Sequence, residues 1–316
     1  MRIRTFQFVL LSVFCLTSIC SWASSNDDDD WGFAAVRSPE IPSYVKFCGE
    51  KISFDRIDMA ERLDRELTIT VYSHTQTSLI IKRANRYFPR LIEILKDNSI
   101  PEDLIYLAVA ESAMDPTVVS SAKAAGIWQF MPATGKQYGL EVNDDVDERF
   151  DPEKETVAAC KYFRDAYSKF GNWPTVCASY NAGMGKISNE LKSQQESNAL
   201  DLRLVSETSR YTFRILAYKI FLSNPKQFGY HIYRDQLYQP IEYRTVTVNT
   251  SVDSWVTWAK EHGISYAQLR DANPWIRSNK LPNETGRIYK VKVPKSDSLY
   301  RSKAGNKVFN RNWVVD

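Results

Sequence analysis

The sequence of 316 residues predicts a mainly α-helical protein that ends in a small α+β module. From about residue 61 to 240, apolar positions recur at helical spacing and Pro and Gly mark the helix ends. From about 243 to 295, the pattern changes to a strand, two short helices and a strand. With 43% hydrophobic residues and 13% aromatic residues, the chain can bury a substantial core.

Residues 1–23 have the pattern of an export signal. Arg2 and Arg4 precede an apolar run from Phe6 to Ile19, and small residues precede the expected cut after Ala23. The run is shorter than a membrane-spanning helix requires, and we expect no transmembrane segment in the mature chain. An alternative interpretation places a lipid on Cys20 and so attaches the protein to the outer membrane, although the residues before Cys20 match a lipidation site poorly.

Residues 24–60 contain the acidic run Asp27 to Asp30 and scattered prolines, which is typical of a solvated spacer. The helical region from 61 to 240 follows. Helices are expected from Pro101 through a run that is apolar on every face, from Pro152 to Gly171, from Asn172 to Gly183, and from Ser206 to Leu222.

The last part of the chain divides into a module over 243–295 and a tail over 296–316. Within the module we expect strands at Arg244–Val248 and Tyr289–Val293, with helices at Trp255–Lys260 and Tyr266–Asp271 between them. The tail is basic and is expected to be loose.

Charge excludes one class of partner. Without Arg2 and Arg4, the chain has 39 basic residues against 38 acidic ones, so neither a nucleic acid nor an anionic membrane gains electrostatic support. A neutral polymer fits better.

Cysteine and histidine usage indicates no metal site. Processing leaves Cys48, Cys160 and Cys177, so at least one thiol is free in an exported chain. Cys160 and Cys177 could pair, but buried free cysteines are the commoner outcome. No Cys/His cluster has metal-ligand spacing, and we expect neither a metal nor a cofactor.

Glu111 is the first candidate for a chemical role. It ends the apolar helix that runs from Leu104 to Ala110, before the stop at Asp115-Pro116. Desolvation there would raise the pKa of the carboxyl, which suits a general acid. The alternative is a glutamate that turns outward to solvent, and this segment alone leaves both interpretations open.

Several motifs occur in register after Glu111. They are Glu111-Ser112, Ser120, Gly126 to Pro132 with Trp128-Gln129 inside it, and Ser179 to Gly183 with Tyr180-Asn181 inside it. Together they resemble the lytic transglycosylases of the soluble and membrane-bound type D group, whose motifs read Glu-Ser, Gly-Leu-Met/Trp-Gln and Ala-Tyr-Asn. The similarity covers roughly residues 85 to 225 and implies a goose-lysozyme-like catalytic domain.

The resemblance implies a reaction. Glu111 would protonate the oxygen between N-acetylmuramic acid and N-acetylglucosamine, then act as a base on the C6 hydroxyl to give a 1,6-anhydro product. A single acid suffices where the substrate's acetamido group assists. Asp115, Asp147 and Glu148 lie in turns or polar loops, and none offers a convincing second carboxylate.

The resemblance also implies substrate-binding roles for other residues. Tyr180 and Gln129 would orient Glu111 and the N-acetyl groups, since each offers a directional hydrogen bond without charge. Ser120 matches a serine near the acetamido group, and Tyr211 matches a tyrosine of the cleft.

Four of these positions also allow structural interpretations. Trp128 could floor a sugar-binding cleft or belong to the core. Asn181 could contact substrate or cap the turn toward Gly183. Tyr211 could simply pack, and Ser112 could bond back to its own helix.

The C-terminal module resembles the LysM fold, a βααβ unit that binds N-acetylglucosamine in glycans. The matching features are Asn273-Pro274 and the closing apolar strand before Pro294, while the opening turn lacks the usual Gly and Asp. The module is therefore a degenerate copy. A packing domain without glycan affinity is the alternative.

These observations predict an exported, periplasmic lyase that cleaves the glycan strands of peptidoglycan. Two alternatives remain at this point. One is a hydrolytic muramidase, which would need a second carboxylate or a positioned water, and the other is a wall-binding protein without activity.

Overall fold

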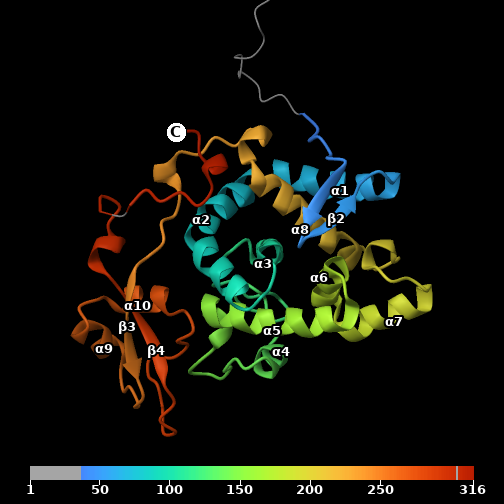
Figure 1. Ribbon diagram of the computed structural model, residues 1–316. Helices are drawn as coiled ribbons and strands as arrows, with labels where there is room; N and C mark the ends of the chain where they lie inside the picture. The colour runs from blue at the N-terminus through green and yellow to red at the C-terminus, as the bar shows by residue number, and fades with distance from the viewer. Residues whose placement is uncertain (1–36, 304) are drawn as a thin grey trace, which may run out of the picture. The chain divides into compact units, whose positions relative to one another are not determined.

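The computed structural model describes residues 37–303 and 305–316 (Figure 1). The predicted export signal, Cys20 and the run Asp27 to Asp30 lie outside the described residues. Residues 39–316 form one compact unit. Its main helices are α1 (Ile57–Tyr72), α2 (His74–Asp97), α3 (Ile105–Ser112), α4 (Pro132–Gln137), α5 (Pro152–Phe170), α6 (Trp173–Ala182), α7 (Met184–Gln194) and α8 (Ser206–Ser223).

The predicted helix boundaries are confirmed in α5 and α6. The carboxylate of Asp151 accepts hydrogen bonds from the backbone N–H groups of Glu153 and Lys154 at the start of α5, which ends at Gly171 with a φ of 71°. At the start of α6, the Asn172 side chain accepts from the backbone N–H of Thr175. Each cap satisfies N–H groups that the first helical turn leaves without partners.

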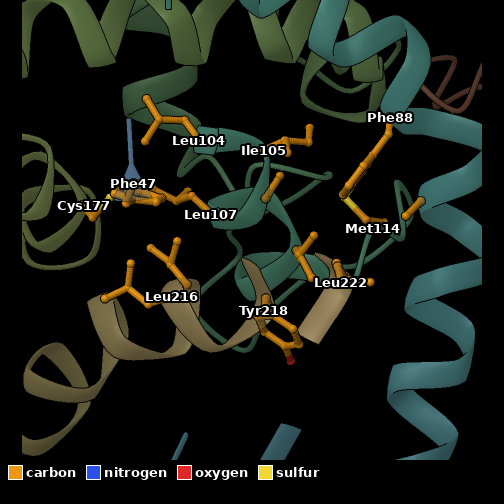
Figure 2. Close-up of a cluster of buried hydrophobic side chains, with 14 of the residues drawn as sticks. Phe47, Phe88, Leu104, Ile105, Leu107, Met114, Cys177, Leu216, Tyr218 and Leu222 are labelled. Carbon is orange, nitrogen blue, oxygen red and sulfur yellow. The ribbon is translucent and has the colours of Figure 1, made fainter. Parts of the chain in front are cut away.

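Helix α3 is central to the helical part. In Figure 1 it lies within the ring that α2, α5, α6 and α8 draw, and it packs on α2 and α8. Leu104 and Leu107 are buried in the main core, as their apolar run predicts. Figure 2 shows Leu107 beside Phe47 and above Leu216 of α8. A short helix that is apolar on nearly all sides is stable only when it is enclosed in this way.

The expected spacer ends earlier than predicted. Within residues 24–60, β1 (Tyr44–Phe47) and β2 (Glu50–Ser53) form an antiparallel hairpin. Phe47 is fully buried in the main core, so the hairpin belongs to the folded unit. The spacer interpretation is therefore wrong for residues 44–60, because two four-residue strands carry too few apolar positions to be seen as a pattern.

The expectation of a loose tail is also wrong for its last residues. Trp313 is 1% exposed, and its indole N–H donates to the backbone oxygen of Leu222 at 2.6 Å. The ring packs edge-on against Phe88 of α2. The chain end is thus fastened to the helical part by an aromatic anchor.

The C-terminal module has the predicted strand–helix–helix–strand order. It consists of β3 (Tyr243–Val248), α9 (Trp255–Glu261), α10 (Tyr266–Ala272) and β4 (Tyr289–Pro294). The two strands pair antiparallel, and the module has a core of its own that includes Trp255, Leu269 and Val291.

The module contacts the helical part through the loop that precedes α5. The backbone N–H of Asp147 donates to the oxygen of Trp275, and Arg287 forms an ion pair with the buried Glu148.

Cys48, Cys160 and Cys177 are free thiols in the structure, and the latter two are buried. The predicted preference for free, buried cysteines over a Cys160–Cys177 pair is confirmed.

Candidate active site

Glu111 lies in the last turn of α3, where the chain leaves the helix. Ala113 and Met114 both have left-handed backbone conformations, with φ angles of 52° and 60°, which end the helix abruptly. Arg83 of α2 holds this turn, because it donates to the backbone oxygen of Ala113 and pairs with Asp115 at 2.7 Å. The position of the Glu111 carboxyl is therefore set by α2 as well as by α3.

Burial and a tyrosine hydroxyl govern the protonation of Glu111. Burial is the largest influence and raises the pKa of Glu111 to about 7. A hydrogen bond from Tyr211 and the charge of Arg214 act in the opposite direction and lower this pKa. The charge of Glu207 raises it further. A carboxyl with such a pKa is populated in both the acid and the base form at neutral pH.

Tyr211 is the direct partner of Glu111. Its hydroxyl donates a hydrogen bond to Oε1 of Glu111 from the facing side of α8, and its ring is 2% exposed. The packing interpretation of Tyr211 is thus incomplete, since the buried hydroxyl contacts the carboxylate. Burial and the charge of Glu111 both raise the pKa of Tyr211 well above its usual value, which keeps the hydroxyl a hydrogen-bond donor.

Tyr180 occupies a different position from the one expected. Its hydroxyl donates to the backbone oxygen of Trp128 at 2.8 Å, so Tyr211, not Tyr180, is hydrogen-bonded to the candidate acid. The ring still lies close enough for the charge of Glu111 to contribute, after burial, to a strongly raised pKa of Tyr180. Tyr180 therefore supports the loop around residue 128.

That loop folds under a steric restriction at Gly126. Gly126 has a φ of 86°, and a Cβ atom there would lie 1.8 Å from the backbone oxygen of Arg149. The same Cβ would lie 2.5 Å from both carboxylate oxygens of Glu155. Only a residue without a Cβ atom allows the backbone to approach Arg149 and Glu155 this closely.

Glu155 is a residue that the sequence did not single out. It is fully buried in α5, and its two carboxylate oxygens accept from the backbone N–H groups of Ile127 and Trp128, each at 2.8 Å. In the sequence it was indistinguishable from the acidic residues that commonly occupy the first turn of a helix. Its role here is to hold the loop that carries Gln129.

Gln129 has a strained, left-handed backbone conformation, and its side chain is held by backbone groups. Its φ is 52°, and its side-chain amide donates to the backbone oxygens of Val118 and Gly126 at 3.1 and 2.8 Å. Left-handed backbone at a non-glycine residue is typical of functional loops. Ser120 lies nearby in the chain and is partly exposed, with its Oγ accepting from the backbone N–H of Ala124.

Three other predicted binding residues have structural roles. Trp128 is 0% exposed and its indole N–H donates to Thr156, so the cleft-floor interpretation is wrong and Trp128 belongs to the core. Ser112 is buried, and its hydroxyl bonds back to Ala108 as its alternative interpretation predicts. Asn181 accepts from the hydroxyl of Thr208, which links α6 to α8.

The three acidic residues that the sequence offers as weak candidates for a second catalytic carboxylate all form ion pairs with basic side chains. Asp115 pairs with Arg83, Asp147 with Arg149, and Glu148 with Lys154. Among residues 37–303 and 305–316, no group of three or more His, Cys, Asp or Glu side chains is arranged to hold a metal ion. Over the same ranges, no helix is long and apolar enough to cross a membrane.

Comparison with known families identifies two domains in the chain. Residues 91–202 match the transglycosylase SLT domain, and residues 244–297 match the soluble lytic transglycosylase C-terminal LysM-like domain. The chain belongs to the SLT-domain lytic transglycosylases that carry a LysM-like C-terminal domain.

Among individual proteins, membrane-bound lytic murein transglycosylase D of Escherichia coli K12 is 31% identical over 242 residues, which are 72% of this chain and 50% of that protein. Soluble lytic murein transglycosylase of the same organism is 31% identical over 124 residues, 36% of this chain and 19% of that protein.

The crystal structure of the 70-kDa soluble lytic transglycosylase of E. coli matches with a TM-score of 0.40 and 22% identity, over 53% of this chain and 30% of that one. In the comparison with membrane-bound lytic murein transglycosylase D, the chain spans about half the length of that protein.

Proposed function

We propose that the protein is a peptidoglycan lytic transglycosylase that cleaves the β-1,4 bond between N-acetylmuramic acid and N-acetylglucosamine and leaves a 1,6-anhydro-N-acetylmuramic acid end. One observation carries the proposal most directly. Glu111, which lies within the range that matches the SLT domain, combines a pKa of about 7 with a hydrogen bond from Tyr211. The names of both curated relatives support the same activity.

The first step is acid catalysis. Protonated Glu111 gives its proton to the glycosidic oxygen, the bond from that oxygen to C1 of the muramic acid breaks, and N-acetylglucosamine leaves with the proton. The substrate's acetamido group supports the positive charge that develops at C1. The Tyr211 hydroxyl then stabilises the Glu111 carboxylate that this step creates.

The second step returns the proton. The Glu111 carboxylate removes it from the C6 hydroxyl of the same muramic acid, and the C6 oxygen bonds to C1. No water is consumed, and Glu111 ends in its starting form. A pKa near 7 suits both steps, because a group that is too acidic fails in the first and one that is too basic fails in the second.

The surrounding loop positions the sugar. The Gln129 side chain and the Ser120 hydroxyl are set by backbone hydrogen bonds, and both can face the N-acetyl groups of a bound strand. The LysM-like module would hold the enzyme on the wall and raise the local concentration of glycan. We place this activity in the periplasm, which the export pattern of residues 1–23 supports.

Product analysis tests the proposal. Mass spectrometry of the fragments released from purified peptidoglycan should find anhydro-ended products, one water lighter than the hydrolytic ones. Products with reducing ends would make the protein a muramidase. No products with wall binding retained would make it a binding protein.

A further inference from the structure

A cavity lies where the helical part meets the LysM-like module. Its volume is about 440 Å³, and Glu111 is not among the residues that line it. Arg83 and Arg86 of α2 contribute to one wall, Asp115 to Thr117 follow the candidate acid helix, and Arg270 and Arg277 come from the module. The cavity thus joins the segment after Glu111 to a separate folded module.

The lining of this cavity has an excess of positive charge. Four arginines face two carboxylates, those of Asp115 and Asp271. Asp115 is already paired with Arg83 at 2.7 Å. Arg86, Arg270 and Arg277 form no ion pair with any of the described residues. Their charges are therefore available to a ligand.

The arginines of the module are held in fixed positions. The guanidinium of Arg277 lies over the Phe150 ring at 4.2 Å, and one nitrogen of Arg270 donates to the Tyr266 hydroxyl at 2.6 Å. Nε of Arg270 is buried and has no hydrogen-bond partner among the described residues. A buried donor without a partner is rare in folded proteins and indicates a missing acceptor. Burial and the charge of Arg270 also lower the pKa of Arg277.

The cavity is within reach of the proposed reaction centre. Asp115 follows Glu111 by four residues, so their Cα atoms are at most about 14 Å apart. The same segment continues to Val118, whose backbone oxygen accepts from the Gln129 amide. An extended peptide of four or five residues, attached to a muramic acid beside Glu111, spans about the same distance.

We propose that this cavity binds a carboxylate of the stem peptide that muramic acid carries in peptidoglycan. The inference rests on the proposed function and adds a substrate preference to it. A guanidinium pairs with a carboxylate through two parallel hydrogen bonds, and such pairs are stronger than neutral ones. The enzyme would therefore favour peptide-bearing strands over naked glycan.

Two substrates of equal length, peptide-bearing strands and strands freed of peptide, test this preference. The double variant Arg270→Gln/Arg277→Gln should lower kcat/KM about tenfold on peptide-bearing strands and leave it unchanged on peptide-free strands. Arg86→Gln changes a lining residue of α2, outside the module, and should show the same selectivity, so a folding defect in the module cannot explain the result. The control is Arg301→Gln, which removes an exposed arginine outside the cavity and should change neither rate.

Equal losses on both substrates, or no loss on either, would overturn the inference. A binding measurement separates this result from a failure of the proposed function. Calorimetry with a free stem tetrapeptide and Glu111→Gln protein should show binding that weakens with salt and is lost when Arg270 and Arg277 are also replaced. If the wild type cleaves neither kind of strand, the proposed transglycosylase function is wrong. If the arginine variants bind the peptide as tightly as the parent protein, the proposed carboxylate site is wrong, whether or not the function holds.

Discussion

Opposing influences on the pKa of one carboxyl suit Glu111 to the proposed role as both acid and base. Burial raises its pKa, while the Tyr211 hydroxyl and Arg214 lower it, and the result is about 7. The charge of Glu207 raises the pKa further. The influences of Tyr211 and Glu207 each come from one side chain, so each can be removed by a substitution. Glu111 itself, Tyr211 and Glu207 are therefore tested in turn.

Replacing Glu111 tests the acid itself. Glu111→Gln keeps the size of the side chain but can neither give nor take a proton, so we expect turnover of purified peptidoglycan to fall by about 1,000-fold or more. The melting temperature should stay close to that of the wild type. Near wild-type release of muropeptides would exclude Glu111 as the acid.

Replacing Tyr211 should move the pH profile upward. Its hydrogen bond favours the charged form of Glu111 and lowers the pKa, so Tyr211→Phe should raise it above about 7. Because the first step needs protonated Glu111, kcat/KM falls as pH rises through this pKa, and the falling limb should shift to higher pH. Tyr218→Phe alters another buried tyrosine of α8 and should leave the limb in place.

Glu207 should have the opposite effect on the same limb. Its charge raises the pKa of Glu111, so Glu207→Gln should lower that pKa and move the falling limb to lower pH. Turnover should persist, because Glu207 is exposed and takes no part in the proposed reaction. A loss of 1,000-fold would instead favour a hydrolytic mechanism with Glu207 as the second carboxylate.

At the scale of elements, helix ends were predictable and the loops between them were not. Asp151-Pro152 and Gly171 mark the ends of α5, because a capping residue, a proline in the first turn and a terminal glycine can be recognised from the local sequence alone. The loop over 125–130 carries no periodic pattern. Its shape depends on Glu155, which contacts it from 28 residues away at Ile127. A contact of that kind leaves no trace in local sequence.

The loop provides a stability prediction with a matched control. Gly126→Ala would place a Cβ atom 1.8 Å from the oxygen of Arg149, so we expect the free energy of unfolding to fall by about 3 kcal/mol or more. Gly171 also has a positive φ, but a Cβ there would meet nothing within 4 Å. Gly171→Ala should therefore lose only about 1 kcal/mol. Equal losses in urea unfolding would contradict the steric explanation.

At the scale of the whole unit, distant parts of the chain close the fold. Phe47 from the hairpin and Trp313 from the tail both enter the main core, although neither lies in the region that the sequence predicts to be catalytic. The module is joined to the helical part by Arg287 on Glu148 and by backbone pairing at Asp147. The helical core is therefore completed by segments outside the stretch that matches the SLT domain.

The contribution of Trp313 to the stability of the fold can be measured. Trp313→Ala removes a fully enclosed ring and leaves the oxygen of Leu222 without its donor, so the free energy of unfolding should fall by about 3–5 kcal/mol. Tyr300→Ala changes an exposed aromatic residue of the same tail and should stay within about 0.5 kcal/mol of the wild type. A comparable stability for the two variants would show that the tail is dispensable.

The sequence by itself determined the mainly helical class, the ends of α5, α6 and α8, the burial of the α3 run and the choice of Glu111 as the candidate acid. These depend on neighbouring residues, on periodicity and on motifs in order along the chain. Only the tertiary structure decided that Tyr211 contacts Glu111, that Trp128 belongs to the core, and that the hairpin and tail complete the fold. Tyr211 lies 100 residues from Glu111, and a hydrogen bond over that separation exists only because α8 packs against α3.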